Sequence, residues 1–361
     1  MLWRREEDKI AATTARTWRR FATWFAAVFG GGIAALYLFV LLVDPYDVIP
    51  FSLPIDRQIV SISQRHMYPQ IIRSRRFDSV IVGTSTSRLL DPGILSRLFD
   101  ARFANLAMDS MTAWEQHRVA QYFVRHAGAP RVLVIGLDTV WCDEAADRNR
   151  ITFRGFPDWL YDDNRWNDAL YLLNGQTVEI AARLIGNRLG LYPERVRYDG
   201  FEIFVPEEDK YDLVRAREHI WRNRPREAVA AVLPVELSDG QKRKLAFPAL
   251  AWLDSMLAAL PASTIKVLAY MPVHIAAQPI PGSRGAAREA ECKDRIATIA
   301  RRRGAAVVDW RIASPITRED ANYWDPLHYR LPIAERIARE LADAVRQGRP
   351  SADGSYRIVV R

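Results

Sequence analysis

The N-terminal part of the chain contains one long segment without a charged residue, residues 21–43. This apolar run is longer than the roughly 20 residues that an α-helix needs to cross the hydrocarbon core of a bilayer. A secretory signal peptide has a shorter apolar core and ends at a cleavage site of small residues, whereas this run continues into Asp44, Pro45 and Tyr46. The pattern therefore predicts a transmembrane anchor rather than a cleaved signal peptide.

Charges on the two sides of this segment predict its orientation. Residues 1–20 contain six basic and three acidic side chains, whereas Asp44, Asp47 and Asp56 follow the segment before the first basic residue, Arg57. Because basic residues that flank a span stay on the cytoplasmic side, the N-terminus is expected in the cytoplasm. No later stretch is long and apolar enough to span again. We therefore expect a single-pass protein of the bacterial inner membrane with a periplasmic main domain.

A second pattern begins after residue 76, where short apolar runs alternate with amphipathic helical patterns. The apolar runs, interpreted as buried strands, are 77–83, 101–107, 131–138, 264–272 and 305–310. The helical patterns are 114–126, 245–260, 286–303 and 333–345. Apolar strands that alternate with helices are typical of a parallel sheet covered on both faces. We therefore predict an α/β fold with a five-stranded parallel sheet in a three-layer α/β/α sandwich, preceded by one transmembrane helix.

The same patterns divide the chain into segments. They are a cytoplasmic tail (1–20), the transmembrane helix (21–43), a stalk rich in turn-forming residues (44–76), the α/β domain (77–345) and a C-terminal tail (346–361). Within the α/β domain, residues from about 141 to 260 are too many for one crossover between strands, and we expect a mainly helical insertion there. Its Trp141, Trp159 and Trp166 would either stack on sugar rings or pack in the core.

Composition excludes several classes of function. The chain has a net charge of +8, but its basic residues lie in no recognisable nucleic-acid-binding module, so no nucleic-acid partner is expected. Only two cysteines occur, Cys142 and Cys292, without a CxxC motif, and they would either form one disulfide or remain buried thiols. Because His and carboxylate residues form no metal-ligand cluster at useful spacing, neither a metal nor another cofactor is predicted.

Candidate chemistry lies near the two ends of the α/β domain. Residues 83–85 (GTS) follow the first predicted strand, and residues 325–328 (DPLH) precede the last predicted helix. A serine hydroxyl becomes a nucleophile when a base removes its proton, and a carboxylate orients the base. We therefore expect Ser85 Oγ about 2.6–3.2 Å from a ring nitrogen of His328, with Asp325 on the other nitrogen. The alternatives are a helix-capping role for Ser85 and a surface or capping role for His328.

These motifs resemble those of the SGNH (GDSL-like) hydrolase superfamily, whose sheet is flavodoxin-like. The resemblance covers roughly residues 77–345, with GTS where the family has Gly-Asp-Ser. It implies Ser85 as nucleophile, His328 as general base and Asp325 as the residue that orients His328. The residues expected to bind oxyanion or substrate, by the resemblance or by their place at the same sheet edge, are Gly83, Arg88, Ser110, Asp138 and His274. Loop 105–110 lacks the family's glycine, and Asp138 stands where the family has asparagine.

Among members of the superfamily, the chain looks like membrane-anchored envelope proteins that take part in O-acylation of alginate and other exopolysaccharides or in D-alanylation of teichoic acids. This implies a serine esterase or O-acyltransferase acting on acyl esters of envelope or exopolysaccharide glycans, with a glycan and envelope assembly proteins as partners. The alternative is a non-catalytic relative that binds glycan or scaffolds a polysaccharide assembly machine. Asp138 favours this alternative because a carboxylate opposes a developing oxyanion, whereas Ser85 and residues 325–328 favour the enzyme.

Overall fold

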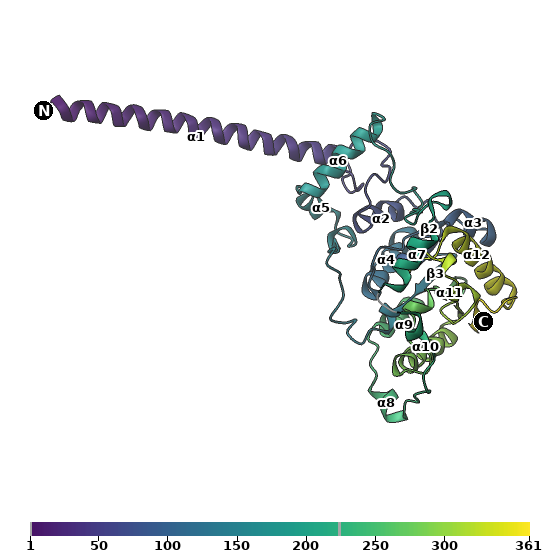
Figure 1. The fold of residues 1–361 in the computed structure, drawn as a ribbon. Helices are drawn as coiled ribbons and strands as arrows, with labels where there is room; N and C mark the ends of the chain where they lie inside the picture. Colours follow the sequence, from purple (N-terminus) through teal and green to yellow (C-terminus); the bar gives the residue numbers. More distant parts are fainter. Residues whose placement is uncertain (1, 223–224) are drawn as a thin grey trace. The chain divides into compact units, whose positions relative to one another are not determined.

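The computed structural model describes residues 2–222 and 225–361, which form two compact units (Figure 1). The first, called the anchor unit, contains residues 2–60 and 163–193. The second, the sheet unit, contains residues 61–162 and 194–361 apart from 223–224. The long segment between the third and fourth predicted strands therefore contributes residues to both units.

The anchor unit begins with helix α1 (Leu2–Val43), in which residues Thr13–Val43 are long and apolar enough to cross a membrane. Such a helix near the N-terminus is either a membrane anchor or a signal sequence. The helix ends where Asp44 adopts a left-handed conformation with φ of 44°. The buried carboxylate of Asp44 then accepts the backbone N–H groups of Val48 at 3.0 Å and Ile49 at 2.7 Å, which turns the chain away from the helix axis.

Two further helices, α5 (Arg165–Tyr171) and α6 (Gly175–Arg188), complete the anchor unit. The Tyr37 hydroxyl of α1 donates to the backbone carbonyl of Ala169 in α5 at 2.8 Å. Beyond the end of α1, the Tyr46 hydroxyl lies 3.2 Å from the Thr177 hydroxyl in α6. The last turns of α1 are thus covered by protein, and Val43 is buried, whereas residues 13–36 are exposed.

The sheet unit is built on a six-stranded sheet in the order β2-β1-β3-β4-β5-β6. The strands are β1 (Ser79–Val82), β2 (Phe103–Asn105), β3 (Val132–Leu137), β4 (Ile265–Tyr270), β5 (Ala305–Asp309) and β6 (Arg357–Val360). Strands β1 to β5 lie in the five predicted runs, and all pair in parallel. Burial on both faces, complete in β1 and β3, explains the apolar runs.

The prediction of a five-stranded sheet is wrong by one strand. Residues 357–360, within the predicted C-terminal tail, form β6 and pair antiparallel with β5. This strand has only four residues and follows a segment rich in Gly, Pro and Ser. Short edge strands carry little hydrophobic signal because only part of their surface is buried, and only Val360 of β6 is buried.

The sheet unit also contains helices before, between and after these strands. They are α2 (Gln64–Arg73), α3 (Pro92–Phe99), α4 (Ala113–Ala127), α7 (Leu213–Trp221), α8 (Asp239–Lys244), α9 (Ala249–Ala258), α10 (Arg284–Arg303), α11 (Pro315–Arg318) and α12 (Leu331–Ala342). Short 3₁₀ turns are Ser85–Ser87, Thr139–Cys142, Asp158–Leu160, Glu208–Lys210, Arg226–Val229, Ile275–Ala277 and Asp320–Asn322, and a π-turn is Asp343–Gln347. Helix α12 packs against α3, whereas α4 packs against α2 and α9, and α9 packs against α10.

The order of the strands reverses between β1 and β3, because β2 lies on the outer side of β1. In open parallel sheets, ligands bind at the carboxyl ends of the strands beside such a reversal. Two glycines permit close packing there. A Cβ atom on Gly83, just after β1, would lie 2.6 Å from Ser87 Oγ, and a Cβ atom on Gly136 in β3 would also clash with that atom.

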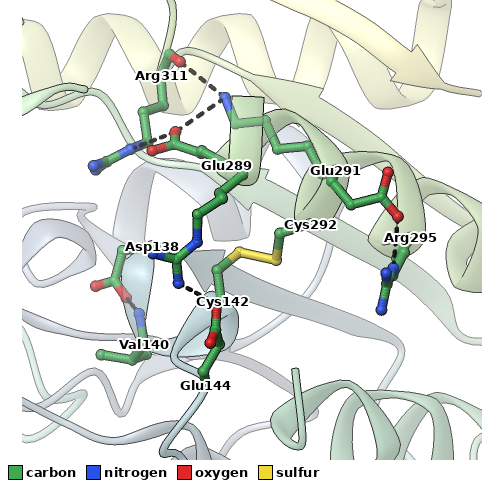
Figure 2. Close-up of a disulfide and its surroundings, with 11 residues drawn as sticks. Asp138, Val140, Cys142, Glu144, Glu289, Glu291, Cys292, Arg295 and Arg311 are labelled. Atoms are coloured by element: carbon green, nitrogen blue, oxygen red, sulfur yellow. Dashed lines mark hydrogen bonds and ion pairs between the residues drawn. A yellow bond between two sulfur atoms is a disulfide. The ribbon is translucent and has the colours of Figure 1, made fainter. Parts of the chain in front are cut away.

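A disulfide joins Cys142 to Cys292 in α10, with 5.8 Å between their Cα atoms (Figure 2). The sequence left this pairing open. Cys142 ends the 3₁₀ turn after β3, so the bond ties the carboxyl end of β3 to α10. Because disulfides persist in oxidising compartments, this bond points to an extracytoplasmic sheet unit.

Replacement of Cys142 and Cys292 by serine should lower the free energy of unfolding of the sheet unit. The two cysteines are 150 positions apart in the sequence, and the loss of a native cross-link costs about 2–5 kcal/mol. Urea unfolding of the variant and of the oxidised wild type measures the difference. Alkylation of the denatured, unreduced wild type is the control, and modification of either cysteine would show that no disulfide forms.

Candidate functional site

Ser85 and the DPLH segment meet at the carboxyl edge of the sheet. The Nε2 atom of His328 lies 2.8 Å from Ser85 Oγ, and its Nδ1 atom lies 2.7 Å from Asp325 Oδ2. Ser85 begins the 3₁₀ turn that follows β1, and all three side chains remain partly exposed. A serine, an imidazole and a carboxylate linked in this order form the arrangement that activates serine as a nucleophile.

The Asp325 carboxylate also folds the turn that carries His328. Its Oδ1 atom accepts the backbone N–H groups of Leu327 at 2.8 Å and of His328 at 2.9 Å. Burial by itself would raise the pKa of Asp325, but the hydrogen bonds from the His328 side chain and from these two N–H groups lower it below its ordinary value. The carboxylate therefore stays ionised and holds the imidazole and the turn together.

Two contacts attach this turn to the strands beside it. The Tyr329 hydroxyl donates to the backbone carbonyl of Thr86, next to Ser85. The backbone N–H of His274, after β4, donates to the Pro326 carbonyl at 2.8 Å. Tyr329 was not singled out in the sequence, although a buried tyrosine beside DPLH needs a partner for its hydroxyl. Segments far apart in the sequence thus hold the DPLH turn against the Ser85 turn.

Asn105, the last residue of β2, holds the other side of the Ser85 turn. Its buried side-chain N–H₂ group donates to the carbonyls of Ser87 and Leu90 at 2.9 Å and of Arg88 at 3.2 Å. Its Oδ1 atom accepts the backbone N–H of Ala107 at 3.0 Å. Because buried carbonyls need hydrogen-bond donors, Asn105 stabilises the conformation of the chain that follows Ser85.

Asp138 follows β3 directly and lies next to the same turn. Its Oδ2 atom accepts the Thr84 hydroxyl, and its Oδ1 atom accepts the backbone N–H of Val140 at 3.0 Å. Desolvation raises the pKa of Asp138 above its ordinary value, although these two hydrogen bonds oppose the shift. Arg88, which the sequence predicted for the same oxyanion or substrate site, is not among the hydrogen-bond partners of Asp138, which are Thr84 and Val140.

Arg88 instead connects the Ser85 turn to residues 202–204. Its guanidinium forms an ion pair with Glu202 and lies 3.9 Å from Asp109. The same guanidinium lies over the ring of Phe204, 4.2 Å from its centroid. The Phe204 ring meets the His328 ring edge-on, with 5.2 Å between centroids. Arg88 thereby helps to place an aromatic side chain against the candidate base, a contact that the sequence did not reveal.

Two other predicted residues lie away from Ser85. The His274 side chain is buried. Its Nδ1 atom accepts the backbone N–H of Ala276 at 3.1 Å, and its Nε2 atom lies 3.2 Å from Asp320 Oδ1. Ser110 is exposed in a turn with φ of 51°. Among the hydrogen bonds of the described residues, none joins either side chain to Ser85.

Most backbone N–H groups of the loop after β2 are already occupied. The N–H of Ala107 donates to Asn105, that of Met108 donates to the Gly83 carbonyl at 3.0 Å, and that of Asp109 donates to Gln64 at 2.9 Å. These groups are therefore not available to an oxyanion without rearrangement. The N–H of Ser85, at the start of its turn, remains the nearest candidate donor because the first N–H groups of a helical turn lack partners within it.

A cavity of about 150 Å³ is lined by Asp138 and by Cys142 of the disulfide; Figure 2 shows these two residues. Its lining includes Asp138, Cys142, Tyr270 and Arg311. Arg311 is paired with Glu289 at 3.0 Å, so much of the charge in the lining is already neutralised. In the described part of the chain, His, Cys, Asp and Glu form no cluster that could hold a metal ion.

Comparisons with known proteins add no relative to this picture: no family model matches the chain, and no curated protein sequence matches it.

Replacement of Asp138 by asparagine should stabilise the sheet unit at neutral pH. Because the folded-state pKa of Asp138 is raised above its ordinary value of 3.8, the charged carboxylate destabilises the folded state above that pKa. This penalty decreases as the pH falls through the raised pKa and is absent below the ordinary value, where the carboxyl is protonated in both states. Urea midpoints of wild type and variant, measured from neutral pH down into the acid range, report the effect.

Asp294→Asn, on the exposed side of α10, is the matched control and should not reproduce this pH-dependent gain. An Asp138→Asn variant that is as stable as wild type at every pH would contradict the assigned direction of the pKa shift.

Proposed function

We propose that this chain is a membrane-anchored, extracytoplasmic serine esterase or O-acyltransferase that acts on acyl esters of envelope or exopolysaccharide glycans. The observation that carries the proposal is the hydrogen-bonded series Ser85–His328–Asp325, with distances of 2.8 and 2.7 Å. The strand order β2-β1-β3-β4-β5 is that of flavodoxin-like sheets. Together with helices that pack in two groups, α3 with α12 and α4 with α9 and α10, it supports a three-layer sandwich of the SGNH kind.

The first half of the reaction would form an acyl-enzyme. Ser85 Oγ attacks the carbonyl carbon of the ester while His328 Nε2 accepts the hydroxyl proton. Asp325 holds Nδ1 and stabilises the imidazolium that results. When the tetrahedral intermediate collapses, the bond between the carbonyl carbon and the sugar oxygen breaks. His328 then gives the proton to the leaving sugar oxygen, and the acyl group remains on Ser85.

The second half would release the acyl group by the same steps in reverse. Either water or a second sugar hydroxyl attacks the acyl carbon, and His328 takes its proton and returns it to Ser85. Water as the acceptor makes the protein an esterase, and a sugar hydroxyl makes it an O-acyltransferase. Both outcomes use the same three side chains, so the acceptor that reaches the site decides between them.

The site offers few hydrogen-bond donors that could stabilise the oxyanion. The backbone N–H of Ser85 supplies one donor, and Asp138 stands where the resemblance implies an asparagine donor. A charged Asp138 would oppose the oxyanion, whereas a protonated carboxyl can donate a hydrogen bond to it. Desolvation raises the pKa of Asp138, which favours the protonated form.

Helix α1 and the disulfide support a proposal for the compartment. We propose that α1 is a retained anchor in a bacterial inner membrane, with the N-terminus in the cytoplasm and the sheet unit in the periplasm. The hydrogen bond of the half-buried Tyr37 to α5 and the burial of Val43 support retention, because cleavage of α1 would remove both. The basic residues before the span and the bond between Cys142 and Cys292 support the orientation.

A second function is a non-catalytic glycan-binding or scaffold protein of an envelope polysaccharide assembly machine. Two observations favour it: Asp138 in the position of the asparagine, and the occupied N–H groups of residues 107–109. Such a protein would retain the fold and the Ser85 contact without turning over an ester. Reactivity of Ser85 distinguishes the two functions.

Ser85 should react with a fluorophosphonate probe, because such probes label serines that a neighbouring base has activated. Labelling of the full chain in detergent should be lost in Ser85→Ala and reduced by at least about 10²-fold in His328→Ala. Ser87→Ala is the matched control, because Ser87 lies in the same turn but its hydroxyl is buried, and it should retain labelling. Gel fluorescence after a timed exposure measures the rate.

Labelling that persists in Ser85→Ala would remove Ser85 as the nucleophile. No labelling of a folded wild type would favour the scaffold function.

If the chain is an esterase, Asp138→Asn should increase its hydrolysis of para-nitrophenyl acetate at neutral pH. An amide donor at the oxyanion position replaces a group that donates only when protonated, and a single such donor is worth at least about tenfold in rate. The initial rate at neutral pH measures this, with Asp138→Ala as the control for loss of the charge alone. Equal rates for the Asn and Ala variants would mean that residue 138 does not contact the oxyanion.

A further inference from the structure

The anchor unit carries a group of exposed apolar side chains around the end of α1. They lie on two segments. One is the loop after α1, and the other is helix α5 together with the loop that follows it. We call this group the collar: Phe51, Leu53, Trp166, Leu170, Tyr171 and Leu173. Trp166 is 92% exposed and Leu170 is 77% exposed. Since residues four apart share one face of a helix, these two side chains form one apolar stripe on α5.

Hydrogen bonds place both segments of the collar at the level of the apolar span. Tyr37, which lies within the uncharged run 21–43, donates to Ala169 in α5 at 2.8 Å. The backbone N–H of Leu53 donates to the carbonyl of Leu42, also within that run, at 2.7 Å. Tyr37 precedes the end of the helix by about 9 Å along its axis. Helix α5 therefore lies no further than one tyrosine side chain from the apolar segment of α1.

Two arginines near the collar, Arg57 and Arg165, find their partners within the anchor unit. Arg57 donates to the carbonyl of Asp44 at 2.6 Å and lies 3.3 Å from the Asp47 carboxylate. Arg165, at the start of α5, donates to the carbonyls of Asp47 and Val48, each at 3.1 Å. The ion pair of Arg57 and the hydrogen bonds of Arg165 lower the cost of placing these two side chains near hydrocarbon.

We propose that the collar is a membrane-binding surface that inserts into the lipid interface of the leaflet on the far side from the N-terminus. Exposed Trp and Tyr side chains are typical of this interface, and amphipathic segments bury their apolar face about 5–10 Å into the boundary between headgroups and acyl chains. The collar is continuous with the lipid-facing surface of α1, so the same bilayer covers both. The anchor unit is thereby seated in the membrane surface rather than suspended from it.

This inference rests on the part of the proposed function in which α1 is a retained anchor, but not on the chemistry of Ser85. A nitroxide spin label on Leu170→Cys tests it in the full chain, reconstituted in vesicles of phosphatidylethanolamine and phosphatidylglycerol. Both native cysteines are in the disulfide, so the introduced thiol is the one that reacts. Power-saturation measurements compare collisions of the label with oxygen, which is enriched in lipid, and with a water-soluble nickel chelate.

We expect the ratio of oxygen to nickel collisions at Leu170→Cys to be several-fold higher than at Leu233→Cys. Leu233 is the matched control because it is an equally apolar side chain, 89% exposed, in the sheet unit. A label on Phe29→Cys, within the span, gives the value for lipid. Leu173→Cys provides a second collar position in case Leu170→Cys does not fold.

A lipid-like collision ratio at Phe29→Cys together with water-like ratios at Leu170→Cys and Leu173→Cys would overturn the proposal that the collar binds the membrane. That result would not contradict the anchor or the proposed enzyme. A water-like label at Phe29→Cys as well would overturn both the collar and the anchor, without bearing on the reactivity of Ser85.

Discussion

The hydrogen bonds accepted by the Asp325 carboxylate determine the conformation on which the candidate site depends. One oxygen accepts the backbone N–H groups of Leu327 and His328, and the other lies 2.7 Å from His328 Nδ1. The same group therefore folds the turn and orients the ring. Burial opposes ionisation, but the hydrogen bonds that the carboxylate accepts lower its pKa below the ordinary value, which favours the ionised form that accepts them. Without that carboxylate, the turn would lose two hydrogen bonds to its backbone, and His328 Nδ1 would lose its partner.

The carboxyl edge of the parallel sheet supplies the groups that face this turn. Gly83 and Gly136 allow β1 and β3 to approach closely around Ser87, and Asn105 satisfies three carbonyls of the chain after Ser85. Because the packing around Ser87 and the hydrogen bonds of Asn105 are local to this edge, the Ser85 turn is held rigidly before any ligand arrives. Such preorganisation is what a nucleophile or a precise binding contact requires.

Each of the two units has a feature that bears on where the protein resides. In the sheet unit, the bond between Cys142 and Cys292 ties the segment after Asp138 to α10. The bond that indicates an oxidising compartment therefore also holds the chain beside the candidate site. In the anchor unit, the uncharged run of α1 continues into a folded end, where Asp44 caps the turn and Tyr37 contacts α5. A protein with both features combines a bond suited to an oxidising environment with a surface suited to a membrane.

Hydrophobic patterning alone determined the apolar span and the five parallel strands, because burial on both faces makes each strand a continuous apolar run. The expectation that Ser85 and His328 meet came from the chemistry of an activated serine and from the resemblance to SGNH hydrolases, and in the structure His328 Nε2 lies 2.8 Å from Ser85 Oγ. The pattern did not predict the short edge strand β6, because so little of this strand is buried. Tertiary structure alone decided several other contacts. They are the partners of Asp138 and Arg88, the contact of Tyr329 with Thr86 and the pairing of the cysteines. Most of these contacts join residues that are distant in sequence, and a local sequence pattern does not indicate which distant residues meet.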